Sequence, residues 1–138
     1  MKVFISHSSA DADLAKRVAD TLRKSGFQVW DASDTSQVLP GDNWGEKLAS
    51  ALEESSAMVV LLTPNSAKSS NIMLELGYAL GNMDYKGRVI PVLAATPEQL
   101  PIDQIPWVLR HFQIIRLPSE ERDGKAIQQI ADALLAAA

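Results

Sequence analysis

The sequence predicts an α/β domain in which helices cover both faces of a five-stranded parallel sheet. Short apolar segments alternate with amphipathic segments along the 138 residues, as is typical of βαβ units. The strongest apolar segment, Ala57–Thr63 (AMVVLLT), has no polar residue before its last position. Such a run is typical of a strand buried on both faces, which is the situation inside a parallel sheet.

The expected elements follow one another in βα order. The expected strands are Lys2–Ser6, Phe27–Trp30, Ala57–Thr63, Arg88–Leu93 and Phe112–Leu117. The expected helices are Ala10–Ser25, Trp44–Ser55, Ser69–Gly81 and a last segment that contains Ile127, Ile130, Ala131, Leu134 and Leu135. Ser8 or Ser9 can cap the first helix and Gly26 can end it. Pro91 falls inside the fourth strand, so we expect a local bulge or a missing ladder bond there.

This alternation favours the strand order 2-1-3-4-5, which is the flavodoxin-like arrangement of a three-layer sandwich. In such sheets ligands bind outside the carboxyl ends of the strands, near the point where the strand order reverses. That point lies after the first and third strands. Ser6 and His7 end the first strand, and Ser69–Gly81 begins soon after the third. These segments are therefore expected to meet at one edge of the sheet.

Ser69–Gly81 (SSNIMLELGYALG) is predicted to be an amphipathic helix with one carboxylate beside its apolar face. At about 100° per residue, one broad apolar arc contains Ile72, Met73, Leu76, Ala79, Leu80 and Met83. Glu75 falls just outside this arc, on the flank that it shares with Asn71 and Tyr78. A helix that presents an acid to a small molecule has this pattern, and so does a helix with one solvated acid. The helix alone leaves both interpretations open.

Composition and charge exclude several classes of function. With a net charge of −4 and no long basic run, the chain is not expected to bind nucleic acid. No apolar stretch reaches the roughly 18 residues of a membrane span, and we expect a cytoplasmic protein that does not enter the membrane. Cysteine is absent, and the two histidines, His7 and His111, have no carboxylate cluster of ligand spacing around them, so no metal site is expected.

Four segments carry a family resemblance: Val3–Ser9 (VFISHSS), Leu39–Trp44 (LPGDNW), Met58–Ser66 (MVVLLTPNS) and Glu75–Ala79 (ELGYA). They resemble, in this order, four parts of the TIR (Toll/interleukin receptor) domain family, and its bacterial members most closely. These parts are the first strand with its loop, the end of the BB loop, the third strand with its exit, and the catalytic segment of the NAD-cleaving branch. The resemblance implies that residues 1–138 form a single TIR domain.

The resemblance implies an enzyme that cleaves NAD⁺ between nicotinamide and ribose, as an NAD⁺ glycohydrolase or an ADP-ribosyl cyclase. NAD⁺ would be the substrate, with no separate cofactor, and no G-x-G-x-x-G loop is present for a dehydrogenase-like grip. Glu75 would be catalytic, since its carboxylate would bind the ribose hydroxyls and stabilise positive charge as the bond breaks. The substrate-binding residues would be Ser6, His7, Trp44, Asn71 and Tyr78. Asn71 stands where many NAD-cleaving members have a tryptophan.

The resemblance also implies self-association into higher oligomers or filaments. The assembly residues of the BB loop, within 31–43, would be Asp34, Leu39, Pro40, Gly41 and Asp42. Bacterial members of this kind often serve anti-phage defence, in some cases by making a nucleotide product that a downstream effector senses. The alternative function is a non-catalytic adaptor that works by homotypic TIR–TIR assembly. A third is a nucleoside deoxyribosyltransferase, which shares the α/β layout and uses a carboxylate at a glycosidic carbon.

Ordinary structural roles compete with each of these assignments. A solvated helix residue is the competing interpretation for Glu75, and a polar loop residue is the competing one for His7. Trp44 begins an apolar stripe, so it is equally suited to core packing. Asp31 and Asp34 lie in a polar loop, where solvated side chains are expected and a contact with ribose is the alternative.

Overall fold

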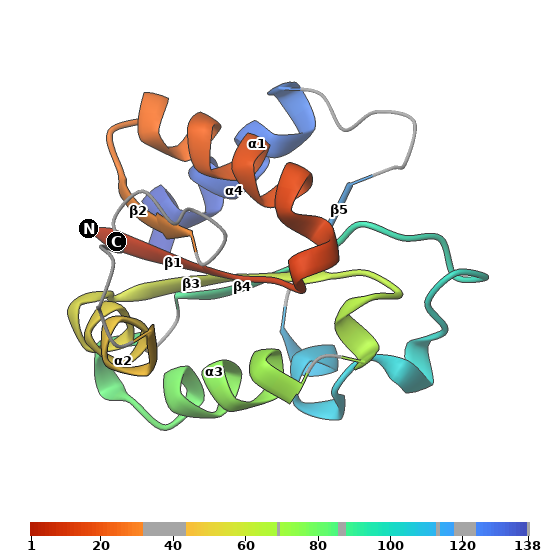
Figure 1. The fold of residues 1–138 in the computed structure, drawn as a ribbon. Helices are drawn as coiled ribbons and strands as arrows, with labels where there is room; N and C mark the ends of the chain where they lie inside the picture. Colours follow the sequence, from red (N-terminus) through yellow and green to blue (C-terminus); the bar gives the residue numbers. More distant parts are fainter. Residues whose placement is uncertain (32–43, 69, 86–87, 113, 118–123, 138) are drawn as a thin grey trace.

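Five parallel strands form one sheet in the predicted order, β2-β1-β3-β4-β5 (Figure 1). The computed structural model describes residues 1–31, 44–68, 70–85, 88–112, 114–117 and 124–137. The strands are β1 (Lys2–Ser6), β2 (Gln28–Asp31), β3 (Ala57–Leu62), β4 (Val89–Leu93) and β5 (Ile115–Arg116). The helices are α1 (Ala12–Lys24), α2 (Trp44–Glu54), α3 (Ser70–Leu80) and α4 (Gly124–Ala137). No helix in the described ranges is long and apolar enough to cross a membrane.

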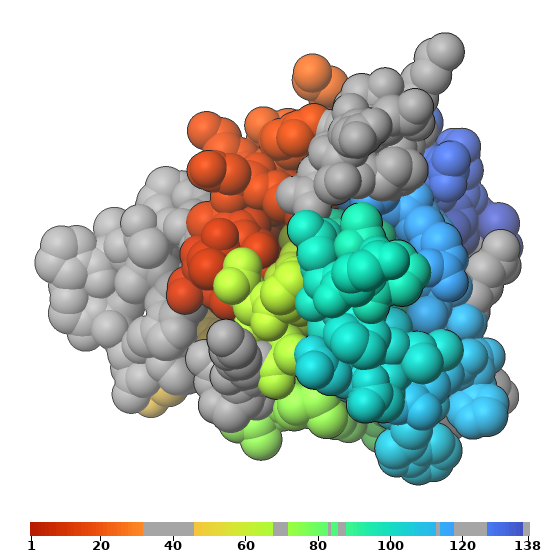
Figure 2. Space-filling view, turned by 90° about the vertical axis from the view of Figure 1, so that its right-hand side faces the viewer, coloured from red at the N-terminus to blue at the C-terminus, as the bar shows by residue number. Residues whose placement is uncertain are grey.

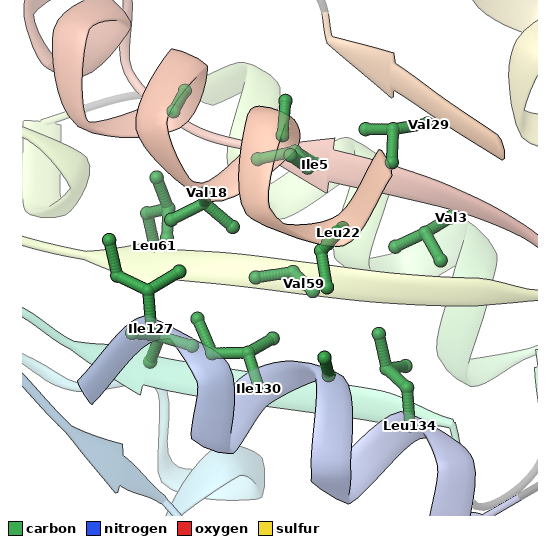
Figure 3. Close-up of a cluster of buried hydrophobic side chains, with 14 of the residues drawn as sticks. Val3, Ile5, Val18, Leu22, Val29, Val59, Leu61, Ile127, Ile130 and Leu134 are labelled. Atoms are coloured by element: carbon green, nitrogen blue, oxygen red, sulfur yellow. The ribbon is translucent and has the colours of Figure 1, made fainter. Parts of the chain in front are cut away.

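Helices cover the sheet on both sides, with α1 and α4 on one face and α2 and α3 on the other (Figure 1). Figure 3 shows Val18 and Leu22 of α1 and Ile130 of α4 converging on Val59 at the centre of β3. On the opposite face, Met58, Val60 and Leu62 of β3 pack in a second cluster with α2 and α3. Alternate residues of β3 thus serve two cores, which explains why its sequence is apolar throughout.

The first helix ends as the sequence predicts and begins slightly later. Ser8 Oγ accepts a hydrogen bond from the Ala10 amide at 3.3 Å, which starts a 3₁₀ turn at Ser9–Asp11 before α1. At the other end Gly26 has a φ of 96°, a conformation that side-chain-bearing residues adopt only with strain. Its amide donates to the Arg23 carbonyl at 3.1 Å. The predicted stop at Gly26 is therefore confirmed.

Pro91 lies within β4 without a bulge. The register between β3 and β4 runs unbroken from Met58↔Val89 to Leu62↔Leu93. Backbone bonds to β3 involve residues 88 and 94, whereas the Leu93 carbonyl accepts from β5, so the backbone at position 91 faces the β5 side. The missing N–H of Pro91 therefore removes no bond from the β3–β4 pair. It also interrupts no bond to β5, because the pairing of β4 with β5 begins only at Val92. The expected bulge is wrong, and the shortness of β5 leaves no ladder bond for Pro91 to interrupt.

The carboxyl ends of β1 and β3 meet at the edge of the sheet that is on the right in Figure 1 and faces the viewer in Figure 2. The segments that follow these strands, red and yellow-green, adjoin each other there, and the segment after β4 lies beside them. The Asp11 carboxylate joins the first two segments. It accepts hydrogen bonds from Thr63 Oγ1 at 2.6 Å and from Asn65 Nδ2 at 3.1 Å. The point where the strand order reverses is therefore held by direct side-chain contacts.

Candidate active site

Glu75 lies inside the buried face of α3, and the prediction that it sits on the flank is wrong. Its side chain is buried with a relative exposure of 6%, and it shares this face with Ile72, Leu76 and Ala79. Met73 and Leu80, which the sequence placed in the apolar arc, are exposed at 53% and 39%. The buried arc is thus rotated by about 50° from the arc that hydrophobicity alone suggests. A carboxylate has taken a position that packing would assign to an apolar residue.

Ser6 is the hydrogen-bond partner of this carboxylate. Ser6 is the last residue of β1 and is fully buried. Side chains alternate along a strand, so Ser6 shares a sheet face with Phe4, which packs in the cluster formed with α2 and α3. Its Oγ donates to Glu75 Oε1 at 2.9 Å. Within the described ranges the second oxygen, Oε2, has no hydrogen-bond partner.

Burial controls the ionisation of Glu75. Removal from water raises the pKa of its carboxyl group from 4.5 to about 7, while the Ser6 hydrogen bond and the positive charge of His7 act in the opposite direction. Near neutral pH the group therefore exchanges between a neutral acid and a carboxylate. A side chain with this property can bind hydroxyl groups or stabilise a developing cation once it is ionised.

His7 and Asp31 form a second polar contact beside the first. His7 Nε2 lies 2.7 Å from Asp31 Oδ1, and both side chains are almost completely buried. His7 Nδ1 lies 2.7 Å from the Ser8 carbonyl oxygen. Asp31 ends β2 and His7 follows β1, so neighbouring parallel strands bring them together. The expectation that Asp31 is a solvated loop residue is wrong, and so is the interpretation of His7 as a mere polar loop residue.

Burial by itself lowers the pKa of His7, but the surrounding groups outweigh it. The hydrogen bonds with Asp31 and the Ser8 carbonyl, and the negative charges of Asp31 and Glu75, raise the pKa of His7 above its ordinary 6.5. Two carboxyl groups, those of Asp31 and Glu75, thus favour the protonated form of the His7 imidazole. Among the described residues, no group of three or more His, Asp or Glu side chains could hold a metal ion.

The remaining predicted residues divide into two groups. Tyr78 is 37% exposed, and its contacts are a hydrogen bond from Asn82 Nδ2 to its hydroxyl at 3.2 Å and an edge-on contact with Tyr85, rather than Ser6 or Glu75. The side chains of Trp44 and Asn71 lie outside the described residues, although their backbones begin α2 and α3. The assembly residues also lie outside the described residues: Asp34, Leu39, Pro40, Gly41 and Asp42.

Sequence reasoning treated Asp31 as a solvated loop residue and missed its contact with His7. The signal was present, since two neighbouring parallel strands end at the same edge and each carries a polar residue there. Asp31 is the register partner of Ile5, only two positions before His7. Once β1 and β2 are assigned as neighbouring strands, this register places Asp31 within reach of His7.

Comparisons with known proteins point to one family. The sequence model of the TIR domain matches residues 3–131. The 2′ cyclic ADP-D-ribose synthase BtTIR of Bacteroides thetaiotaomicron is 30% identical over 91 residues, which are 64% of this chain and 31% of that protein. The chain thus spans about a third of the length of this curated relative.

Solved structures agree on the fold. A TIR-STING receptor from C. gigas, solved with 2′,3′-cGAMP, has a TM-score of 0.74 and 22% identity, over 96% of this chain and 38% of that one. The TIR domain of the Toll-related receptor TRR-2 from Hydra magnipapillata has a TM-score of 0.69 and 18% identity, over 97% and 94%. With the strand order described above and a match from residue 3 to residue 131, the chain belongs to the TIR domain family.

Proposed function

We propose that this TIR domain cleaves NAD⁺ at the bond between nicotinamide and ribose, with Glu75 as the catalytic carboxylate. The observation that carries the proposal is the buried Glu75 side chain at the point of strand reversal, held through Oε1 by Ser6 with Oε2 unpartnered among the described residues. A polar side chain at a buried position that packing would fill with carbon is typical of a functional site. The relative named as a cyclic ADP-ribose synthase supports the same chemistry.

The reaction needs one anion rather than an acid–base pair. Nicotinamide is already cationic in NAD⁺, so when the C1′–N bond breaks, the electron pair goes to the ring nitrogen and the leaving group departs neutral. Positive charge then develops on the ribose as an oxocarbenium ion. Glu75 Oε2 would accept hydrogen bonds from the ribose hydroxyls, and the ionised carboxylate would stabilise the developing charge where little water competes.

The nucleophile decides the product. Attack by water gives ADP-ribose and a proton, whereas attack by a hydroxyl group of the same molecule gives a cyclic ADP-ribose and a proton. Either attack forms the new bond at C1′, so both outcomes use the same carboxylate. The relative's name favours cyclisation, and product analysis distinguishes the two.

The test compares three proteins at high concentration with NAD⁺: the unmutated chain, Glu75→Gln and Glu53→Gln. Glu53 is exposed on α2 and serves as a matched control for the loss of one carboxylate. Chromatography with mass detection follows nicotinamide and its companion product. We expect release by the unmutated chain and by Glu53→Gln, and a loss of at least about 100-fold in Glu75→Gln. Equal activity of all three proteins would refute the role of Glu75.

Self-association is part of the proposal, because the family resemblance includes assembly through the BB loop. The outer side of α3 offers a further apolar surface, where Met73 is 53% and Leu74 is 73% exposed. Specific activity should then rise with protein concentration, and a flat dilution series would contradict assembly. An adaptor without catalysis would assemble and leave NAD⁺ intact. The roles in anti-phage defence and in signalling to an effector stay predictions.

A further inference from the structure

We propose that His7 and Asp31 are a positioning pair for Glu75, in which Asp31 holds His7 as an imidazolium. The pair fixes the end of β1, where Ser6 donates its hydrogen bond to Glu75. It also keeps a positive charge facing the Glu75 carboxylate. The role of Glu75 in catalysis is the proposed function above, and this inference rests on it. The arrangement of the pair can be tested without any turnover of substrate.

The hydrogen bonds of His7 determine its charge. Nδ1 faces a backbone carbonyl oxygen, that of Ser8, and Nε2 faces the Asp31 carboxylate, each at 2.7 Å. Both oxygens can only accept, so both ring nitrogens must donate. A neutral imidazole has a single N–H and would set a lone pair against one of these oxygens. The imidazolium is therefore the form that fits the geometry, and it is not free to act as a general base while these contacts last.

The pair also connects three segments beside Glu75: the end of β1, the 3₁₀ turn before α1 and the end of β2. His7 lies between Ser6, which donates to Glu75, and Ser8, whose Oγ caps the 3₁₀ turn before α1. Through Asp31 it ties this exit segment to the end of β2. Movement of the His7 ring would displace Ser6, the preceding residue, which donates to Glu75. The position of the Glu75 carboxylate therefore depends on the contact between His7 and Asp31.

Charges alternate across the site. Among the described residues, the ionisable groups that face His7 are Asp31 from β2 and Glu75 from α3, and the group that faces Glu75 is His7. Asp11, nearby, is engaged with Thr63 and Asn65. Replacing Asp31 by asparagine removes the counter-ion of His7, which then loses its proton more easily. Glu75 in turn loses a facing positive charge, so it ionises at higher pH.

The first experiment observes His7 directly by ¹⁵N NMR of the unmutated protein labelled at histidine. The chain has two histidines, so the variant His111→Gln assigns the two sets of ring signals. At about pH 8 an ordinary histidine is almost entirely neutral. We expect His7 to show the imidazolium pattern, with both ring nitrogens protonated. The pattern of a neutral tautomer at that pH would overturn the proposal, whatever the behaviour of any variant.

The second experiment follows the Glu75 carboxyl carbon by ¹³C NMR during a pH titration, with Glu75→Gln for assignment. The proteins compared are the unmutated chain, Asp31→Asn and the control Asp132→Asn, an exposed position on α4. We expect the midpoint of Glu75 to rise by about one pH unit in Asp31→Asn and to stay in place in the control. An unchanged midpoint in a folded Asp31→Asn protein would reduce the pair to a structural contact and overturn the proposal.

Enzyme kinetics link the pair to the reaction. The acidic limb of kcat/KM for NAD⁺ cleavage should move upward in Asp31→Asn by the same amount as the NMR midpoint, whereas a merely structural defect would lower the rate at all pH values alike. If the unmutated protein does not cleave NAD⁺, the proposed function fails while both NMR experiments still decide the arrangement of the pair.

Discussion

Replacing Glu75 by glutamine should stabilise the folded protein above neutral pH, even though it should abolish the proposed cleavage of NAD⁺. The folded-state pKa of Glu75 is raised by burial to about 7, so the folded protein holds this proton more tightly than the unfolded chain does. Ionising Glu75 therefore opposes folding. The penalty is absent below the ordinary pKa of 4.5, grows as the pH rises, and is complete above about pH 7.

The size of the effect follows from the same values. Each tenfold change in an ionisation equilibrium corresponds to about 1.4 kcal/mol. The rise from 4.5 to about 7 therefore corresponds to about 3 kcal/mol. Glutamine has nearly the shape of the protonated acid, but its amide group needs partners of its own in a buried place. We therefore expect a net gain of about 1 to 3 kcal/mol at high pH.

Urea unfolding measures this gain as the difference in unfolding free energy between Glu75→Gln and the unmutated protein. The measurement is made at about pH 4 and again at about pH 8.5, on either side of the titration. The difference should be near zero or slightly unfavourable at the lower pH and favourable at the higher one. Glu53→Gln, at an exposed position of α2, should show no such change with pH. A difference that stays the same at both pH values would refute the reasoning from burial.

Four other substitutions test the packing and the site. Ser6→Ala removes the hydrogen bond that lowers the pKa of Glu75, so the acidic limb of the rate profile for NAD⁺ cleavage should move to higher pH, and an unmoved limb would contradict this. Leu76→Ala, at a position 1% exposed, should cost about 2 to 5 kcal/mol in urea unfolding. Leu74→Ala, at 73%, should cost less than about 0.5 kcal/mol, and equal losses would contradict the orientation of α3. Gly26→Ala should cost about 1 kcal/mol, measured by thermal unfolding, because φ is 96° there; an unchanged Tm would contradict it.

The fold was predictable because its signals are local and repeated. The unbroken apolar run of β3 indicated a parallel sheet, and the structure buries all six of its residues. Gly26 and the serines before α1 gave the helix ends within two residues. The bulge expected at Pro91 was wrong for a reason that is not local. Whether a strand tolerates a proline depends on the neighbouring strand, here the short β5, which lies about two dozen positions later in the chain.

The site was predictable only in part. The family resemblance selected Glu75, Ser6 and His7, and the structure brings these three together. Asp31 was missed because the sequence shows a polar residue beside a polar loop, and nothing local reports that His7 lies across from it. Only the pairing of β1 with β2 turns two separate polar residues into a buried pair.

The misplacement of Glu75 follows from the rule used to place it. Hydrophobic periodicity excludes charged residues from a buried arc by construction, so it assigned the arc to Met73 and Leu80 and left the acid outside. The structure reverses this choice, exposing the two apolar residues and burying the carboxylate beside Ser6. An apolar residue at position 75 would make a better helix face and a more stable fold. Ionised Glu75 lowers the folding stability by about 3 kcal/mol, so a requirement other than folding must keep an acid at this position. Stabilising a cation in a site with little water would be such a requirement.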